Sequence, residues 1–384
     1  MQKYVWALIA LTIFSCKKSN QVLDISTEKF NNPLSNSIDS GVHAAYLKHE
    51  DSVNTVGMSI GLYKGGKIYY YGYGETVKGN NTPPNEKTFF EIGSITKTYT
   101  AIATQLMLLE KNQTINQTIR ESLPDSIPVL EKEGEEVTFK HLLNHTSGIP
   151  YFPGNFDIFN SADELAESIK LYDKNKLFTF LKQNPLLFKP GEYLEYSNTA
   201  YGLLGLLLEQ HYKKSFAAVL QEKMFNPLGL LETKTLIEQT DLTRWSKGYE
   251  EGEPVSYLND WNVLAGSGVL KSTLKDVLKY GISNLIPPSG LLGEAIKQSH
   301  QVTYLPFSDA GKYKINGRLG WFQYINNELP NSRFIFHNGS TGGYNSELFI
   351  NTETNSVLVI LFNTRYTGSA RQGFITDLHK IMLQ

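Results

Sequence analysis

Three short motifs, far apart along the chain, carry residues that together could perform acyl transfer. The first is Ser94-Ile-Thr-Lys97, the second is Tyr196-Ser-Asn198, and the third is His337-Asn-Gly339 followed by Ser340. A serine hydroxyl is a weak nucleophile at neutral pH and needs a neighbouring base to take its proton. A lysine three residues further along a helix would point to the same side. Desolvation could lower its pKa enough for it to act as that base.

The segment around the first motif predicts how its residues are positioned. Glu91-Ile-Gly93 reads as a loop with a flexible glycine, and residues 98–110 are apolar at helical spacing. We therefore predict a helix whose first turn holds Ser94. The N-terminus of such a helix offers free backbone N–H groups and a partial positive charge to an oxyanion that forms on a substrate at Ser94.

The second and third motifs supply what such a nucleophile still lacks. Tyr196 and Asn198 are two residues apart, so in an extended loop both side chains would enter the same cleft. The phenol could relay a proton to a leaving group, and the amide could bind a substrate carbonyl. The third motif ends an apolar, strand-like run. Gly339 would let a ligand approach the backbone, and the N–H of Ser340 could act as a second oxyanion donor.

No motif is specific by itself. Ser-x-x-Lys also occurs at Ser15/Lys18 and at Ser272/Lys275, and Tyr-x-Asn recurs elsewhere. Any one of them is compatible with a surface serine, a packed tyrosine or a simple turn. The order of the three motifs and the segments that flank them select the set.

These flanking segments resemble those of the serine β-lactamases and penicillin-recognising D,D-peptidases, in the class C-like branch whose middle element is Tyr-x-Asn. Residues 90–97 resemble the nucleophile segment of that family, residues 141–148 its "LL-x-HTSG" segment, and residues 188–198 its "F-x-PG-x-x-F-x-YSN" run. The resemblance spans roughly residues 56–361. It implies an α+β fold: an antiparallel sheet flanked by N- and C-terminal helices, plus a large helical lobe.

The resemblance also implies a site and a reaction. Ser94 would form an acyl-enzyme, Lys97 and Tyr196 would share the proton transfers, and the choice of base between them stays open. Four further positions would bind the substrate or the oxyanion: Asn198, His337, Gly339 and Ser340. We interpret His145 as mainly structural, in line with the resembling family, with a catalytic histidine as the alternative. We expect Trp245, Trp261 and Trp321 to be packed in the core, and Trp321 is the best candidate if one of them lines a cleft.

The predicted organisation has four parts. Residues 1–15 form a signal peptide and 16–36 a tether; 37–90 and 290–384 form the sheet lobe, and 91–289 the helical lobe, with the active site between the lobes. Helices are predicted over 37–50 and 370–383. Strands are predicted over 57–63 and 67–73, joined by a glycine turn, and over 333–337, 344–351 and 356–362.

The N-terminus indicates export. Lys3 precedes an apolar stretch over residues 4–14, and Ser15-Cys16 follows, with the chain's single cysteine. This resembles a bacterial lipoprotein signal, in which Cys16 is lipidated and anchors the protein to a membrane of the cell envelope. The alternative is an ordinary secretory leader with a chance cysteine.

Composition restricts the partners. A net charge of −2 and a pI near 6.5 give no basic surface for nucleic acid. Histidines are too scattered for a metal site, so we expect no metal and no cofactor. The expected partners are small-molecule or peptide substrates, including those derived from the cell wall.

His337 bears on the substrate. Many β-lactamases of the resembling family carry lysine here, whereas histidine is found in some D,D-peptidases, aminopeptidases and esterases; histidine is mostly neutral at pH 7. We therefore predict a serine hydrolase that cleaves esters or amide bonds, including peptides with D-residues. The alternatives are a true class C-like β-lactamase and a non-catalytic envelope lipoprotein that binds peptide or glycan.

Overall fold

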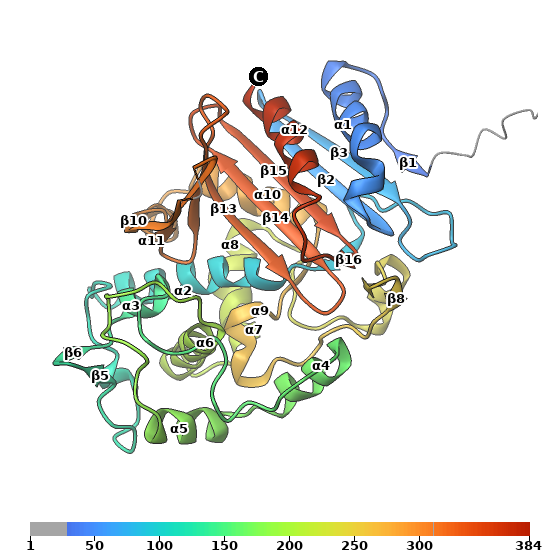
Figure 1. Cartoon of the computed structure of the whole chain (residues 1–384). Coiled ribbons are helices and arrows are strands. Elements are labelled where there is room, and N and C mark those ends of the chain that lie inside the picture. The colour runs from blue at the N-terminus through green and yellow to red at the C-terminus, as the bar shows by residue number, and fades with distance from the viewer. Residues whose placement is uncertain (1–28, 310) are drawn as a thin grey trace, which may run out of the picture.

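A nine-stranded antiparallel sheet forms the centre of the protein in this computed structural model, which describes residues 29–309 and 311–384. Figure 1 shows this sheet between helices. In spatial order its strands are β1 (Phe30–Asn31), β3 (Lys67–Gly74), β2 (Gly57–Lys64), β15 (Ser356–Phe362), β14 (Asn345–Asn351), β13 (Arg333–Ser340), β12 (Phe322–Asn326), β11 (Tyr313–Arg318) and β10 (Val302–Asp309).

The hairpin β2–β3 follows from local turn chemistry. Gly65 and Gly66 both have positive φ, at 57° and 75°, and Lys64 pairs with Lys67 across the turn. Two glycines in this conformation match the twist of the flanking strands. The predicted hairpin is therefore confirmed.

The sheet joins the two ends of the chain. β2 pairs with β15, with Leu62 opposite Leu358 and Ile60 opposite Ile360. Every residue of β15 is buried, because alternate side chains enter two different cores on the two faces of the sheet. The aromatic-rich core lies under the terminal helices α1 (Ser37–Val53) and α12 (Gln372–Leu383), which pack on each other.

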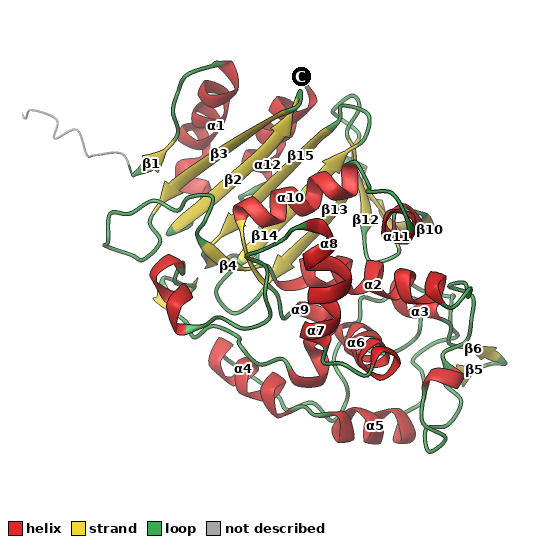
Figure 2. Ribbon diagram, turned by 180° about the vertical axis from the view of Figure 1, so that it is seen from behind, coloured by secondary structure: helices red, strands yellow, loops and turns green. Residues whose placement is uncertain are grey.

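The opposite face of the sheet carries α10 (Leu274–Leu285), which packs on β2, β14 and β15 (Figure 2). α10 lies within the range 91–289 that we predicted as the helical lobe, yet it contacts the sheet. The domain boundaries stay a prediction.

The remaining helices gather around two buried ones, α2 (Thr96–Glu110) and α6 (Asn198–Tyr212), which contact each other. The others are α3 (Phe139–Leu143), α4 (Ala162–Leu171), α5 (Lys174–Gln183), α7 (Phe216–Leu220), α8 (Asn226–Leu228), α9 (Ala265–Gly268) and α11 (Leu291–Ser299). Short strands link this region: β4 (Phe89–Glu91) with β9 (Lys271–Thr273), β5 (Glu131–Lys132) with β6 (Glu135–Glu136), and β7 (Tyr249–Glu250) with β8 (Glu253–Pro254) and β16 (Thr364–Arg365).

The predicted fold class is confirmed, with differences in detail. Strands β10, β11 and β12, which complete the sheet beyond β13, were not predicted. Across residues 29–309 and 311–384, none of the helices has the length and apolar character needed to cross a membrane.

Candidate active site

Ser94 and Lys97 meet at the start of α2. Ser94 lies in a 3₁₀ turn over Gly93–Ile95, and α2 begins at Thr96, so the nucleophile precedes the α-helix that we predicted to contain it. Ser94 Oγ lies 3.2 Å from Lys97 Nζ. Gly93 has a positive φ of 49°, and a Cβ there would come within 2.9 Å of the Ser340 nitrogen. Glycine therefore lets the nucleophile turn contact β13.

Lys97 has no exposed side-chain surface. Its Nζ lies 2.7 Å from Asn198 Oδ1, 2.7 Å from the Ser267 carbonyl oxygen and 3.2 Å from Ser94 Oγ. Within residues 29–309 and 311–384, no carboxylate pairs with it. Burial therefore lowers the pKa of Lys97 well below its usual value. A neutral amine would donate to the two carbonyl-type oxygens and turn its lone pair to the Ser94 hydroxyl.

Tyr196 completes this arrangement. Its hydroxyl lies close enough to the Ser94 side chain for Ser94 to influence its pKa, and its ring centroid lies 4.7 Å from Lys97 Nζ. Burial raises the pKa of Tyr196, so the phenol keeps its proton at neutral pH. In this geometry Tyr196 can donate a proton, and Lys97 can accept one.

The second motif brings its side chains together in a way that we did not predict. Only Tyr196 belongs to a loop: Ser197 caps α6, with its hydroxyl accepting the Ala200 N–H, and Asn198 is the first helical residue. Tyr196 and Asn198 nevertheless both reach the Ser94–Lys97 pair. The turn into the helix, rather than an extended loop, directs them there.

The third motif lies against the nucleophile turn. Pairing between β12 and β13 ends at Phe322 and Phe336, while β13 continues to Ser340 along β14. Residues 337–340 thus extend past β12, and this part of β13 contacts the Gly93–Ile95 turn. A Cβ at Gly339 would lie 2.1 Å from the Ile92 carbonyl oxygen. Only glycine permits this approach, which brings the Ser340 backbone next to Ser94.

His337 is neutral in this setting. Its side chain is 1% exposed, and its Nδ1 lies 2.6 Å from the Asn338 carbonyl oxygen, so Nδ1 carries the proton. Burial, and secondarily the nearby Lys97, lower the pKa of His337 to about 3. Its Nε2 is buried and has no hydrogen-bond partner among the residues that the structure describes. His337 is therefore a potential hydrogen-bond acceptor rather than a cation.

Two functional neighbours were not predicted from the sequence. The Ser267 carbonyl, at the end of α9, holds Lys97, and a backbone carbonyl leaves no signature in the sequence. His145 stacks on Tyr196, with ring centroids 4.4 Å apart. Its place in the segment that resembles "LL-x-HTSG" was the available signal. Trp321 is buried against Tyr280 and His300, which agrees with the expectation of buried packing for the tryptophans and not with the alternative that Trp321 lines a cleft.

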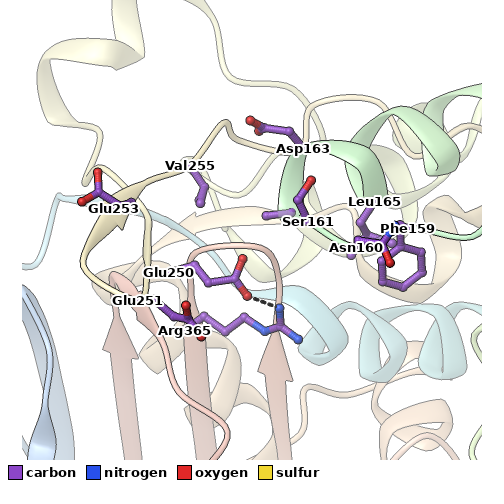
Figure 3. Close-up of a pocket in the computed structure, with 11 residues that line it drawn as sticks. Phe159, Asn160, Ser161, Asp163, Leu165, Glu250, Glu251, Glu253, Val255 and Arg365 are labelled. Carbon is purple, nitrogen blue, oxygen red and sulfur yellow. Dashed lines mark hydrogen bonds and ion pairs between the residues drawn. The ribbon is translucent and has the colours of Figure 1, made fainter.

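A pocket of about 440 Å³ lies beyond the third motif. The pocket is close to the third motif because Gly342, two residues after Ser340, packs against its wall. A Cβ on Gly342 would lie 2.8 Å from the Cβ of Ala162, which lines the pocket together with Val255. Figure 3 shows Glu250 paired with Arg365, and Asp163 on α4. The lining carries four carboxylates and one arginine: Asp163, Glu250, Glu251, Glu253 and Arg365. The surroundings of this pocket are therefore negatively charged.

Two further predictions are not decided by these contacts. Cys16, the predicted lipidation site, lies outside the described residues. Between residues 29 and 384, leaving out 310, no three His, Cys, Asp or Glu side chains come together in a way that could hold a metal ion. The expectation that the reaction needs no cofactor stays a prediction.

Comparison with known proteins identifies relatives of this chain. The family described as Beta-lactamase matches residues 44–379. The chain is 28% identical over 315 residues to "Protein flp" of Staphylococcus aureus (strain COL), covering 80% of this chain and 59% of the relative. It thus spans about three fifths of the length of that protein. It is also 26% identical over 270 residues to a "Beta-lactamase" of Yersinia enterocolitica, covering 70% of this chain and 64% of the relative.

Solved structures support the fold. The chain superposes with a TM-score of 0.74 and 22% identity on the "Beta-Lactamase/D-Alanine Carboxypeptidase from Pseudomonas syringae", covering 90% of this chain and 99% of the other. A protein described as "A class C beta-lactamase" gives a TM-score of 0.74 with 21% identity, covering 89% and 96%. At these identities the likeness concerns the fold.

Proposed function

Because the chain belongs to the Beta-lactamase family, we propose that it is a serine hydrolase that works through an acyl-enzyme on Ser94. The observation that carries the proposal is the contact of 3.2 Å between Ser94 Oγ and a lysine amine whose pKa burial lowers. A serine with an adjacent neutral base has what nucleophilic catalysis requires.

The proposed reaction has two steps. Ser94 Oγ attacks a substrate carbonyl carbon while Lys97 takes the hydroxyl proton. Tyr196 passes a proton to the leaving group as the bond to that group breaks, and it regains a proton from the Lys97 ammonium. Asn198 binds the substrate, and the backbone N–H groups of Ser94 and Ser340 stabilise the oxyanion. A water molecule then attacks the acyl carbonyl carbon, and one of its protons passes through the same side chains to the departing Ser94 Oγ, which restores the serine hydroxyl.

The proposed substrates are esters and amide bonds, with peptides that contain D-residues among them. Neutral His337 accepts hydrogen bonds and offers no charge to a substrate carboxylate. The carboxylates of the pocket next to the third motif would repel one. Both features disfavour a dedicated β-lactamase.

The primary test is covalent labelling. A serine-reactive phosphonate should label the wild-type protein, with the modified peptide containing Ser94, and Ser94→Ala should abolish both label and turnover. Ser283→Ala, on the exposed side of α10, is the matched control and should retain both. Full turnover by the Ser94→Ala protein would refute the proposal, and an unlabelled wild type would favour a non-catalytic binder.

His337→Lys tests the substrate class. We expect this variant to acylate faster with a carboxylate-bearing chromogenic β-lactam than wild type does, while its rate with a neutral aryl ester rises less or falls. The rate ratio of the two substrates is the readout. If the wild type already hydrolyses the β-lactam well and cleaves neither ester nor D-alanyl peptide, the β-lactamase alternative is correct.

We also propose export and anchoring of the protein through lipid on Cys16, based on the leader sequence. Cys16→Ser should move the protein from the membrane fraction to the soluble envelope fraction. Membrane retention by the variant would contradict this proposal.

A further inference from the structure

We propose that His145 is a positioning residue that holds the Tyr196 phenol against Ser94, an inference that rests on the proposed acyl-enzyme reaction. His145 is separated from Tyr196 by about fifty residues in the sequence. Its imidazole and its backbone nevertheless contact Tyr196 and both of its chain neighbours.

Three contacts fix the tyrosine. The backbone carbonyl of His145 accepts the Glu195 N–H at 2.8 Å, and its Nδ1 accepts the Ser197 N–H at 3.1 Å. Between these two bonds, the imidazole stacks on the Tyr196 ring at 4.4 Å and 29°. One residue thus contacts the peptides on both sides of Tyr196 and stacks on its ring.

The chemistry of the position favours histidine. His145 has a positive φ of 62°, a region in which histidine and asparagine are enriched among non-glycine residues. Because Nδ1 accepts a hydrogen bond, the proton lies on Nε2, which is buried and has no hydrogen-bond partner among the described residues. A second proton on the ring would remove the acceptor that holds Ser197.

The surroundings keep the ring neutral. His145 is 3% exposed, and burial is the main cause that holds its pKa well below the usual value. The titratable groups that face it are Lys97 on α2, His337 on β13, Tyr196 and Tyr201 of α6. The contacts of His145 with Tyr196 and its two chain neighbours therefore persist across the neutral pH range.

The consequence for the reaction depends on the leaving group. Tyr196 is needed most when the leaving group is a strong base, such as an amine or an alkoxide, and least when it leaves readily as a nitrophenolate. Lys97 is held by Asn198 and Ser267, so deprotonation of Ser94 does not depend on His145. Loss of His145 should thus impair proton delivery to the leaving group rather than acylation in general.

The test uses two variants. His145→Ala removes both the ring that stacks on Tyr196 and the acceptor of the Ser197 N–H. His145→Asn tolerates the positive φ and retains an acceptor oxygen. His211→Asn, at the last turn of α6, is the matched control. Rates are measured with esters whose leaving groups span a range of pKa. They are divided by the concentration of sites that the phosphonate labels, so that unfolded protein does not contribute.

We expect His145→Ala to lose about 100-fold in kcat with poor leaving groups and less than about 5-fold with nitrophenyl esters, as Tyr196→Phe should. His145→Asn should fall between wild type and alanine. The double variant His145→Ala/Tyr196→Phe should lose little more than Tyr196→Phe alone, because both changes remove the same function.

Two outcomes would overturn the positioning role and leave the acyl-enzyme proposal intact. In the first, His145→Ala lowers kcat equally for all leaving groups. In the second, the losses of His145→Ala and Tyr196→Phe multiply in the double variant. An unlabelled Ser94 in the wild-type protein would overturn both.

Discussion

Lys97 and Lys271 are two fully buried lysines in neighbouring parts of the molecule, and they differ in what faces them. Lys97 is 0% exposed and contacts a hydroxyl, an amide oxygen and a backbone carbonyl. Lys271 is 1% exposed, donates to the Thr235 and Leu258 carbonyls, and stands opposite Glu91 in the β4–β9 pair.

The carboxylates account for the difference in basicity. Burial lowers the pKa of Lys271 to about 8, with Glu91 and Asp260 opposing the shift, whereas no described carboxylate opposes the shift of Lys97. Lys271 thus remains mostly a cation at neutral pH, whereas Lys97 has no described carboxylate beside it to hold its proton. Burial alone does not make a lysine a base; burial without a counter-charge does.

The largest expected contrast comes from removing each amine. Lys97→Met should reduce kcat/KM about a thousandfold, because Ser94 loses its base, with the protein still folded. Lys271→Met should leave the rate per labelled site unchanged and cost about 3 kcal/mol in the free energy of unfolding, because Glu91 loses its counter-charge. Steady-state kinetics and urea denaturation separate the two. Normal turnover by the Lys97→Met protein would show that Lys97 is not the base for Ser94.

A carboxylate placed beside Lys97 should raise its pKa, as the carboxylates near Lys271 do for that residue. In Asn198→Asp the group at 2.7 Å from Nζ becomes an anion, so the pKa of Lys97 should rise and the amine should hold its proton at pH 7. We expect a loss of about 10- to 100-fold in kcat/KM at neutral pH that is partly recovered at alkaline pH. Asn198→Ala, which removes the oxygen without adding charge, should lose activity with no alkaline recovery.

The pH profile of the wild type provides the next test. The protonated form of Lys97 is inactive, so kcat/KM should fall about tenfold per pH unit once the pH drops below its lowered pKa. This fall should persist in Lys271→Met, because Lys271, with a pKa of about 8, takes no part in the proposed reaction. If kcat/KM instead falls below a pH near 8, and if this fall disappears in Lys271→Met, the profile reports Lys271 and not Lys97. That result would contradict the role of Lys97 as the base.

Glu91→Gln should produce the smallest effect. Without that carboxylate the pKa of Lys271 falls further below its unfolded value near 10.5, so the unfolded state binds more protons than the folded state. We expect a loss of about 2 kcal/mol at pH 7 that shrinks as the pH rises towards 10.5. Denaturation at both pH values measures this. A loss independent of pH would mean that Glu91 acts through the Leu258 N–H, which it accepts at 2.5 Å.

The parts of this arrangement that could be predicted are those written in local sequence. Gly65 and Gly66 predict a hairpin because a two-residue turn needs their conformations, and the Ser94–Lys97 contact follows from helical spacing. The family resemblance added the order of the three motifs and the sheet that joins the chain ends.

Contacts between distant segments could not be predicted in this way. The hydrogen bond from Lys97 to the Ser267 backbone and the stacking of His145 on Tyr196 join residues that the sequence gives no reason to pair. Strands β11 and β12 could not be predicted because polar side chains interrupt their apolar pattern. Among these are Asn316 and Gln323, which hydrogen-bond to each other between the two strands.

The pairing of β2 with β15 has a consequence for how the chain acquires its structure. Gly61 pairs with Val359, so about three hundred further residues must be synthesised before β2, already paired with β3, gains its second neighbour. Contacts this distant slow folding, because a long loop must close before the pairing stabilises it. A chain cut before Ser356 would leave β2 with one unpaired edge and α1 without α12, and therefore prone to aggregate.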